Sequence, residues 1–152
     1  MLDPVALRAA VAAHGPVARV VVAAHDGSSP REPGAEMLVW QDGQSGTIGG
    51  GTLEFEAAAK ARALLARRGG PGGERVPLGP ALGQCCGGAV TLVTALIDDA
   101  ALAALEGRAA VAMGTGEMPL SVHRLLTDAR GQGWIPAARL VEGWLVEPVA
   151  VP

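Results

Sequence analysis

The chain has 152 residues and a formal net charge of −3, with 12 Lys and Arg against 15 Asp and Glu. This balance argues against a protein that binds nucleic acid or acidic membranes, because either would present a basic face. Apolar residues make up 49% of the chain, which indicates an ordered protein with its own core. The sequence has no secretory signal pattern and no uninterrupted apolar run of about 18 residues, so we expect a cytoplasmic protein without a membrane span.

Hydrophobic patterning predicts helices and strands that alternate along the chain. Asp3 before Pro4 is typical of a helix start, and Thr52 can cap a second helix that begins after three glycines. Several strands are joined by tight turns, so we expect an α/β fold in a single domain, with a mixed β-sheet and flanking helices. Helices are expected over 4–13, 52–68 and 100–106, and strands over 17–24, 35–40, 45–48, 75–78, 89–97, 108–113, 121–126, 137–140 and 143–146.

Cys85 and Cys86 are adjacent and are the only cysteines of the chain. A disulfide between sequence neighbours is strained, and no second cysteine pair could complete a zinc site. Buried, purely structural cysteines are one interpretation. The glycines around the pair favour another, because they leave the thiols unshielded and their amides favour the reactive thiolate. The loop is therefore predicted to bind a ligand or to handle sulfur.

Two further segments carry polar groups on loops. Three glycines, 49–51, lie where a strand leads into a helix, and amides at a helix start bind anions; a tight turn is the simpler interpretation. Glu54 is either a solvated carboxylate of the first helical turn or a ligand group. Ser28, Ser29 and Arg31 follow a buried strand, and the guanidinium of Arg31 suits a phosphate, although it can equally be an exposed loop arginine.

Three motifs in this order resemble one protein family. They are GSSPREPGAEMLV at 27–39, GTIGGGTLE at 46–54 and LGPALGQCCGG at 78–88. Together they resemble the N-terminal domain of the xanthine dehydrogenase accessory family (XdhC/CoxI), over roughly residues 1–150. The resemblance implies a chaperone rather than an enzyme. Such a chaperone binds the molybdenum cofactor (molybdopterin), holds it while a cysteine desulfurase supplies sulfur to the molybdenum, and delivers it to a xanthine dehydrogenase-type molybdoenzyme.

The resemblance also implies roles for individual residues. Cys85 and Cys86 would face the molybdenum, as metal ligands or in sulfur transfer. The loop 28–31 and the turn 49–51 would hold the pterin and its phosphate. The cofactor-binding residues expected in this way are Ser28, Ser29, Arg31, Gly49, Gly50, Gly51, Glu54, Gln84, Cys85, Cys86, Gly87 and Gly88.

The resemblance implies that full-length family members continue into a Rossmann-like second domain, and we expect this sequence to stop at the linker before it, either as a natural one-domain form or as an N-terminal fragment. We therefore expect a cofactor-binding domain over 1–146 and the start of an interdomain linker over 147–152. The expected partners are the molybdoenzyme, the desulfurase, cofactor-synthesis proteins and a second copy in a homodimer. Two alternatives remain: a thiol-dependent sulfurtransferase or oxidoreductase that uses Cys85 and Cys86, and a non-catalytic module that binds a partner.

Overall fold

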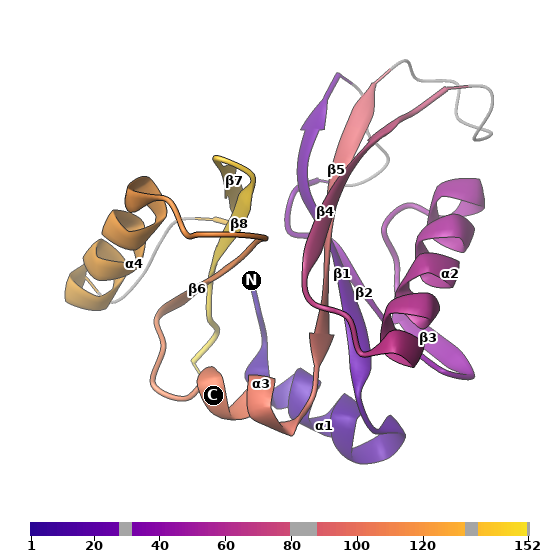
Figure 1. Ribbon diagram of the computed structural model, residues 1–152, viewed down its shortest axis with the longest axis horizontal. Coiled ribbons are helices and arrows are strands. Elements are labelled where there is room, and N and C mark those ends of the chain that lie inside the picture. Colours follow the sequence, from indigo (N-terminus) through magenta and orange to yellow (C-terminus); the bar gives the residue numbers. More distant parts are fainter. Residues whose placement is uncertain (28–31, 80–87, 133–136, 152) are drawn as a thin grey trace.

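A computed structural model describes residues 1–27, 32–79, 88–132 and 137–151 of the chain (Figure 1). Within these residues the helices are α1 (Pro4–His14), α2 (Gly51–Arg67), α3 (Asp99–Ala104) and α4 (Leu120–Gln132). The strands are β1 (Val17–Asp26), β2 (Glu36–Trp40), β3 (Gly43–Gly46), β4 (Gly72–Pro77), β5 (Ala89–Ile97), β6 (Ala110–Met113), β7 (Arg139–Val141) and β8 (Trp144–Pro148). None of the helices in the described part of the chain is long and apolar enough to cross a membrane.

The described strands form two sheets, a large one in the order β3-β2-β1-β5-β4 and a small one in the order β6-β8-β7. Helix α2 covers one face of the large sheet, the small sheet lies beyond the other face, and α4 covers the small sheet from outside (Figure 1). The expected α/β class with flanking helices is confirmed. The strands pair antiparallel throughout both sheets, whereas we expected one mixed sheet; the described part has a parallel contact at the isolated bridge between Leu2 and Val149.

Strand β1 is the centre of the large sheet, and its side chains are buried on both faces. Val20 and Val22 belong to the apolar cluster beneath α2, whereas Val21 and Ala23 pack with Leu145 of the small sheet. A strand covered on both faces reads as a continuous apolar run, which is why this element was predictable from its sequence.

The strand predicted over 121–126 is wrong, because this segment lies inside α4. Val122, Leu125, Leu126 and Ala129 all contribute to the core between α4 and the small sheet. Their spacing is that of one helical face, and it becomes visible only when the window extends as far as Ala129. Helix α2 also begins one residue earlier than expected, with Gly50 and not Thr52 at its cap.

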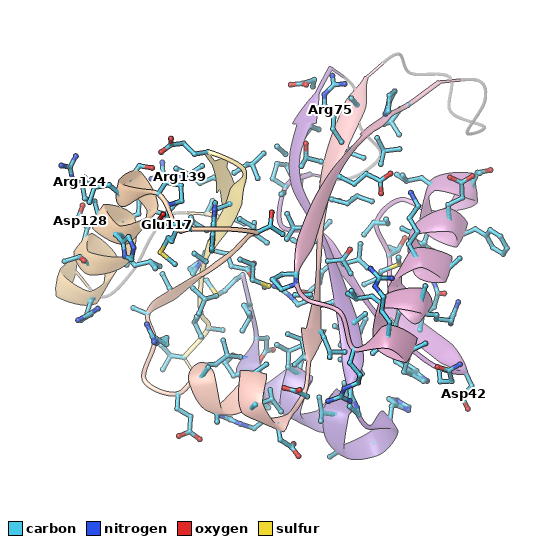
Figure 2. All side chains as sticks on the ribbon, in the orientation of Figure 1. Asp42, Arg75, Glu117, Arg124, Asp128 and Arg139 are labelled. Carbon is cyan, nitrogen blue, oxygen red and sulfur yellow. The ribbon has the colours of Figure 1, made fainter. Side chains whose placement is uncertain are left out.

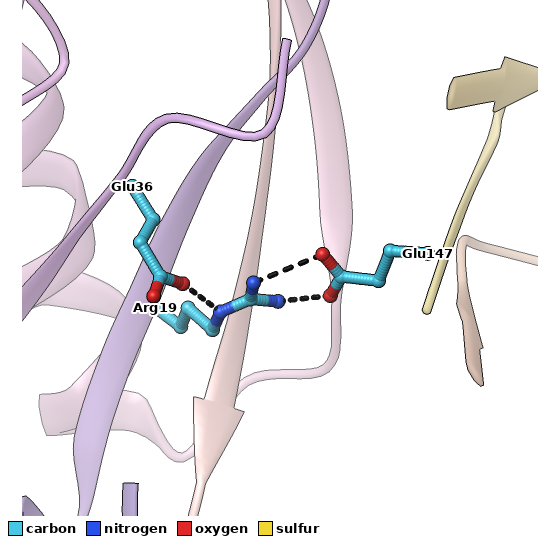
Figure 3. Close-up of polar contacts among 3 residues, drawn as sticks. All are labelled: Arg19, Glu36 and Glu147. Carbon is cyan, nitrogen blue, oxygen red and sulfur yellow. Dashed lines mark hydrogen bonds and ion pairs between the residues drawn. The ribbon is translucent and has the colours of Figure 1, made fainter. Parts of the chain in front are cut away.

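Arg19 of β1 joins the two sheets. Its guanidinium donates to both carboxylate oxygens of Glu147 in β8 and to the carboxylate of Glu36 in β2 (Figure 3). The Nη2 to Oε2 distance to Glu147 is 3.0 Å, and both of these side chains are fully buried. Glu147 and Pro148, where the sequence suggested that a linker starts, thus belong to β8.

Candidate functional site

Most of the predicted loop residues lie outside the described residues. These are Ser28, Ser29, Arg31, Gln84, Cys85, Cys86 and Gly87. The described members of the predicted set are the three glycines 49–51, Glu54 and Gly88. The structure therefore places the residues on either side of the two loops and the whole of the glycine turn.

The residues that flank the two loops meet at one end of the large sheet. Asp26, at the end of β1, pairs with Ala89, at the start of β5, and Ala89 also pairs with Pro77 of β4. Next to these pairs, the amide of Leu78 donates to the carbonyl of Gly88 over 2.7 Å. Residues far apart in the sequence are thus brought side by side at this end.

Gly27 and Gly88 approach each other closely. A Cβ atom built on Gly27 would lie 3.3 Å from the Cα of Gly88, and Gly27 has a φ of +69°. A side chain at Gly27 would be strained by the backbone conformation and would also crowd the backbone of Gly88, the residue before β5. Glycine at position 27 therefore lets the residue before the first loop lie against the residue that follows the cysteine segment.

The glycine turn before α2 depends on three consecutive glycines in the left-handed half of backbone space. Gly49, Gly50 and Gly51 have φ values of 125°, 75° and 66°. Side chains rarely adopt such angles, so the turn requires glycine for its shape. Helix α2 starts at the end of the molecule at which β1 and β4 finish (Figure 1).

Glu54 binds the glycine turn from inside the first turn of α2. Its Oε1 accepts from the amides of Ile48, over 3.0 Å, and Gly50, over 3.1 Å, and from the hydroxyl of Thr47. Partial burial by itself raises the pKa of this carboxyl, but the hydrogen bonds from Thr47, Ile48 and Gly50 outweigh it and lower the pKa below its usual value. The amides of Ile48 and Gly50 thus already have an anionic partner.

One apolar cluster supports all three motifs. Ala35 lies in the first motif, Ile48 and Leu53 in the second, and Leu78 at the start of the third. All four side chains are buried in the cluster between α2 and the large sheet. The cluster therefore fixes the described ends of the three motifs relative to one another.

An ion pair at this end of the sheet was not predicted. Arg75 of β4 pairs with Asp26 over 3.3 Å, and His25 Nδ1 contacts the carbonyl of Gly27 over 3.1 Å. Arg75 lies at the end of the large sheet away from Asp42, which sits in the turn between β2 and β3 (Figure 2). No local signal in the sequence relates Asp26 to Arg75, since both lie beside β5 only in the folded sheet. In the described ranges no three His, Cys, Asp or Glu side chains gather in a way that could hold a metal ion.

Residues 10–76 match the family described as the XdhC and CoxI family. No curated protein is significantly similar to the chain. Among solved structures, the chain is similar to one described as a xanthine dehydrogenase from Bacillus halodurans, with 24% sequence identity and a TM-score of 0.61. That similarity covers 74% of this chain and 37% of the other, so the chain spans well under half of that protein's length, and at this identity the likeness supports the fold.

Proposed function

We propose, from the match of residues 10–76 to the XdhC and CoxI family, that the protein serves the maturation of a xanthine dehydrogenase-type molybdoenzyme. In this proposal the chain binds the finished molybdenum cofactor as cargo, holds it while the molybdenum receives a sulfur atom, and passes it to the enzyme. It acts as a chaperone rather than as a catalyst. A cysteine desulfurase supplies the sulfur, and cofactor-synthesis proteins supply the cargo.

One observation carries the proposal: the described ends of the three motifs converge. Gly27 and Gly88 are in contact range, and Leu78 shares its apolar cluster with Ile48 and Leu53. A cargo with a metal end and a phosphate end needs several unlike groups around one place. The convergence of the described ends of the three motifs supports such a site.

The types of residue suit this cargo. Thiolates are soft ligands that prefer thiophilic metals, so Cys85 and Cys86 are proposed to face the molybdenum. Arg31 is proposed to bind the phosphate, because a guanidinium can donate two parallel hydrogen bonds to it. Ser28, Ser29 and Gln84 would add hydrogen bonds to the pterin.

The glycine turn offers the cargo fewer free amides than its sequence suggests. The carboxylate of Glu54 already accepts from the amides of Ile48 and Gly50. We therefore propose that Glu54 holds the turn in shape, and that Gly49 and Gly51 contribute their small size next to the cargo. A bulky residue at either position would fill that space and distort the backbone.

The test is to purify the chain from cells that overproduce the cofactor, and to measure bound molybdenum by mass spectrometry and pterin by fluorescence. We expect both in equal amounts with the wild-type chain, and loss of both in the double variant Cys85→Ala, Cys86→Ala. Glu74→Gln is a suitable control, because Glu74 forms an exposed ion pair with Lys60 on the face of the sheet that carries α2. Wild-type chain that carries neither molybdenum nor pterin would rule out cofactor binding by this chain.

A further inference from the structure

The edge strands β3, β4 and β6 differ in how they are protected against further strand pairing. At β4, Glu74, Arg75 and Pro77 supply charges and a residue without an amide hydrogen. At β3, the guanidinium of Arg62 donates a hydrogen bond to the carbonyl oxygen of Gly43. Charges, prolines and side-chain contacts of this kind normally prevent a sheet edge from pairing with another chain.

Strand β6 has no such protection. Its four residues, Ala110 to Met113, are all apolar, and it lies at the edge of the small sheet with β8 on one side. An apolar edge strand without charges or prolines presents unpaired backbone groups to which a further strand can add.

The hydrogen-bond register shows which backbone groups of β6 point outward. The amide of Val149 donates to the carbonyl of Ala109 over 3.0 Å, directly before the pair of Ala110 with Pro148. In an antiparallel ladder the bonded and non-bonded pairs alternate, so Ala110 and Ala112 direct their amides and carbonyls away from β8. Pro148 has no amide hydrogen, which agrees with this register. Among the described residues, neither Ala110 nor Ala112 has a backbone partner on that outer side. Ala110 is buried, whereas Ala112 is partly exposed, so the amide and carbonyl of Ala112 are the groups that a further strand can reach.

An apolar groove of about 500 Å³ runs beside this edge. All four β6 residues line it, together with residues of α3, β5 and α4. Its larger apolar side chains include Leu105, Val111, Met113, Met118 and Leu126. Two methionines make the lining adaptable to different apolar side chains. Arg108 is the one charged residue among the described residues of the lining, and its exposed side chain has no ion-pair partner in the described part of the chain.

We propose that the β6 edge binds an extended segment of another protein, which adds antiparallel to β6 as a fourth strand of the small sheet. Alternate apolar side chains of this segment enter the groove. A carboxylate at its C-terminal end pairs with Arg108, because Arg108 precedes β6 and an antiparallel neighbour ends there. This surface is independent of the cofactor site proposed above.

A second copy of the chain fits this edge less well. Two β6 strands related by a two-fold axis would pair about Val111, so that Ala110 of each faces Ala112 of the other. The same register places Arg108 opposite Gly114, and the arginine remains without a carboxylate. Charge complementarity therefore favours an acidic segment of a different protein.

The test uses a synthetic octapeptide of alternating valine and threonine with aspartate as its C-terminal residue. It is titrated into the ¹⁵N-labelled chain and followed by NMR. We expect saturable changes in amide chemical shift that centre on residues 108–113. Ala112→Pro removes an outward amide without breaking a bond to β8, and it should weaken binding by about fivefold or more. Gly73→Pro is the matched control, since Gly73 also directs its amide outward, but on β4; it should bind the peptide like the wild-type chain.

The charge of Arg108 is tested separately by exchanging charges. Arg108→Glu should weaken binding of the aspartate peptide, and a peptide that ends in an amidated lysine should restore it. The proposal is overturned by shifts that centre on β4, by equal binding of the wild-type chain and the Ala112→Pro variant, or by failure of the exchanged peptide to rebind. Sedimentation showing a wild-type dimer that Ala112→Pro dissociates would overturn it too, because a second copy would then be the occupant.

Discussion

Arg19 and Glu147 face each other between the two sheets, and their two parallel hydrogen bonds join the central strand of the large sheet to the central strand of the small one (Figure 3). Burial alone lowers the pKa of the Arg19 guanidinium. The hydrogen bond and charge of Glu147, with those of Glu36, outweigh burial, so that the pKa lies above its usual value. The arginine is therefore a charged and fully paired part of the interior.

Replacing Arg19 should destabilise the fold strongly. Arg19→Met leaves Glu147 buried without its partner, and we expect the free energy of unfolding to fall by about 3–5 kcal/mol. Urea denaturation followed by circular dichroism measures this change. Glu74→Gln is the control, because its ion pair with Lys60 is 51% and 62% exposed at the two side chains; it should cost less than about 1 kcal/mol.

The double variant Arg19→Met, Glu147→Met distinguishes the contribution of the ion pair to stability from that of side-chain packing around it. With both charges gone, we expect much of the lost free energy of unfolding to return, since well-packed apolar side chains often replace a buried ion pair without loss. A double variant as unstable as Arg19→Met alone would contradict this account.

Glu54 should make stability depend on pH in the acidic range. Its pKa in the folded chain is lowered below the ordinary value of 4.5, so the ionised carboxylate stabilises the fold above about pH 4.5 and this contribution is lost as the pH falls further. Glu54→Gln should be less stable than the wild-type chain at pH 7, and the difference should shrink below about pH 4.5. Urea unfolding at pH 7, 5 and 3.5 measures it; a difference that stays constant would contradict the role of the charge.

Gly27→Ala should weaken the candidate site by disturbing the close approach of Gly27 to Gly88. The new Cβ would lie 3.3 Å from the Cα of Gly88 at a φ of +69°, and we expect a loss of about 1–2 kcal/mol in the free energy of unfolding. Bound molybdenum per chain should fall as well. Gly70→Ala is the matched control, because it lies outside the three motifs, none of the described residues comes within 4 Å of its Cβ position and its φ is not positive; it should leave both quantities unchanged.

The single variants Cys85→Ala and Cys86→Ala distinguish the chaperone from the module that only binds a partner. We expect at least one of them to abolish activation of a co-expressed xanthine dehydrogenase-type enzyme while the melting temperature of the chain stays unchanged. Full activation by both variants would support the partner-binding alternative. A persulfide trapped on the wild-type chain after incubation with a desulfurase and cysteine would support the sulfurtransferase.

The accuracy of the sequence-based prediction varied along the chain for physical reasons. The run 17–24 and the strand 89–97 were recognisable because strands buried on both faces are apolar throughout. The segment 121–126 was misread because its apolar residues, taken alone, fit a strand as well as a helix. The antiparallel pairing of both sheets was also out of reach, since strand order depends on contacts between distant segments.

The sequence by itself determined the α/β class, most helices and strands, and the three motifs that resemble one family. These features are local, because they depend on side-chain periodicity, turn residues and glycines whose conformational freedom is intrinsic. Only the tertiary structure decided that Gly27 lies against Gly88, that the carboxylate of Glu54 occupies the amides of the glycine turn, and that Arg19 pairs with Glu147. Each of these relationships, apart from the turn, joins residues more than 60 positions apart, and no local pattern encodes a contact that forms only when the sheets assemble.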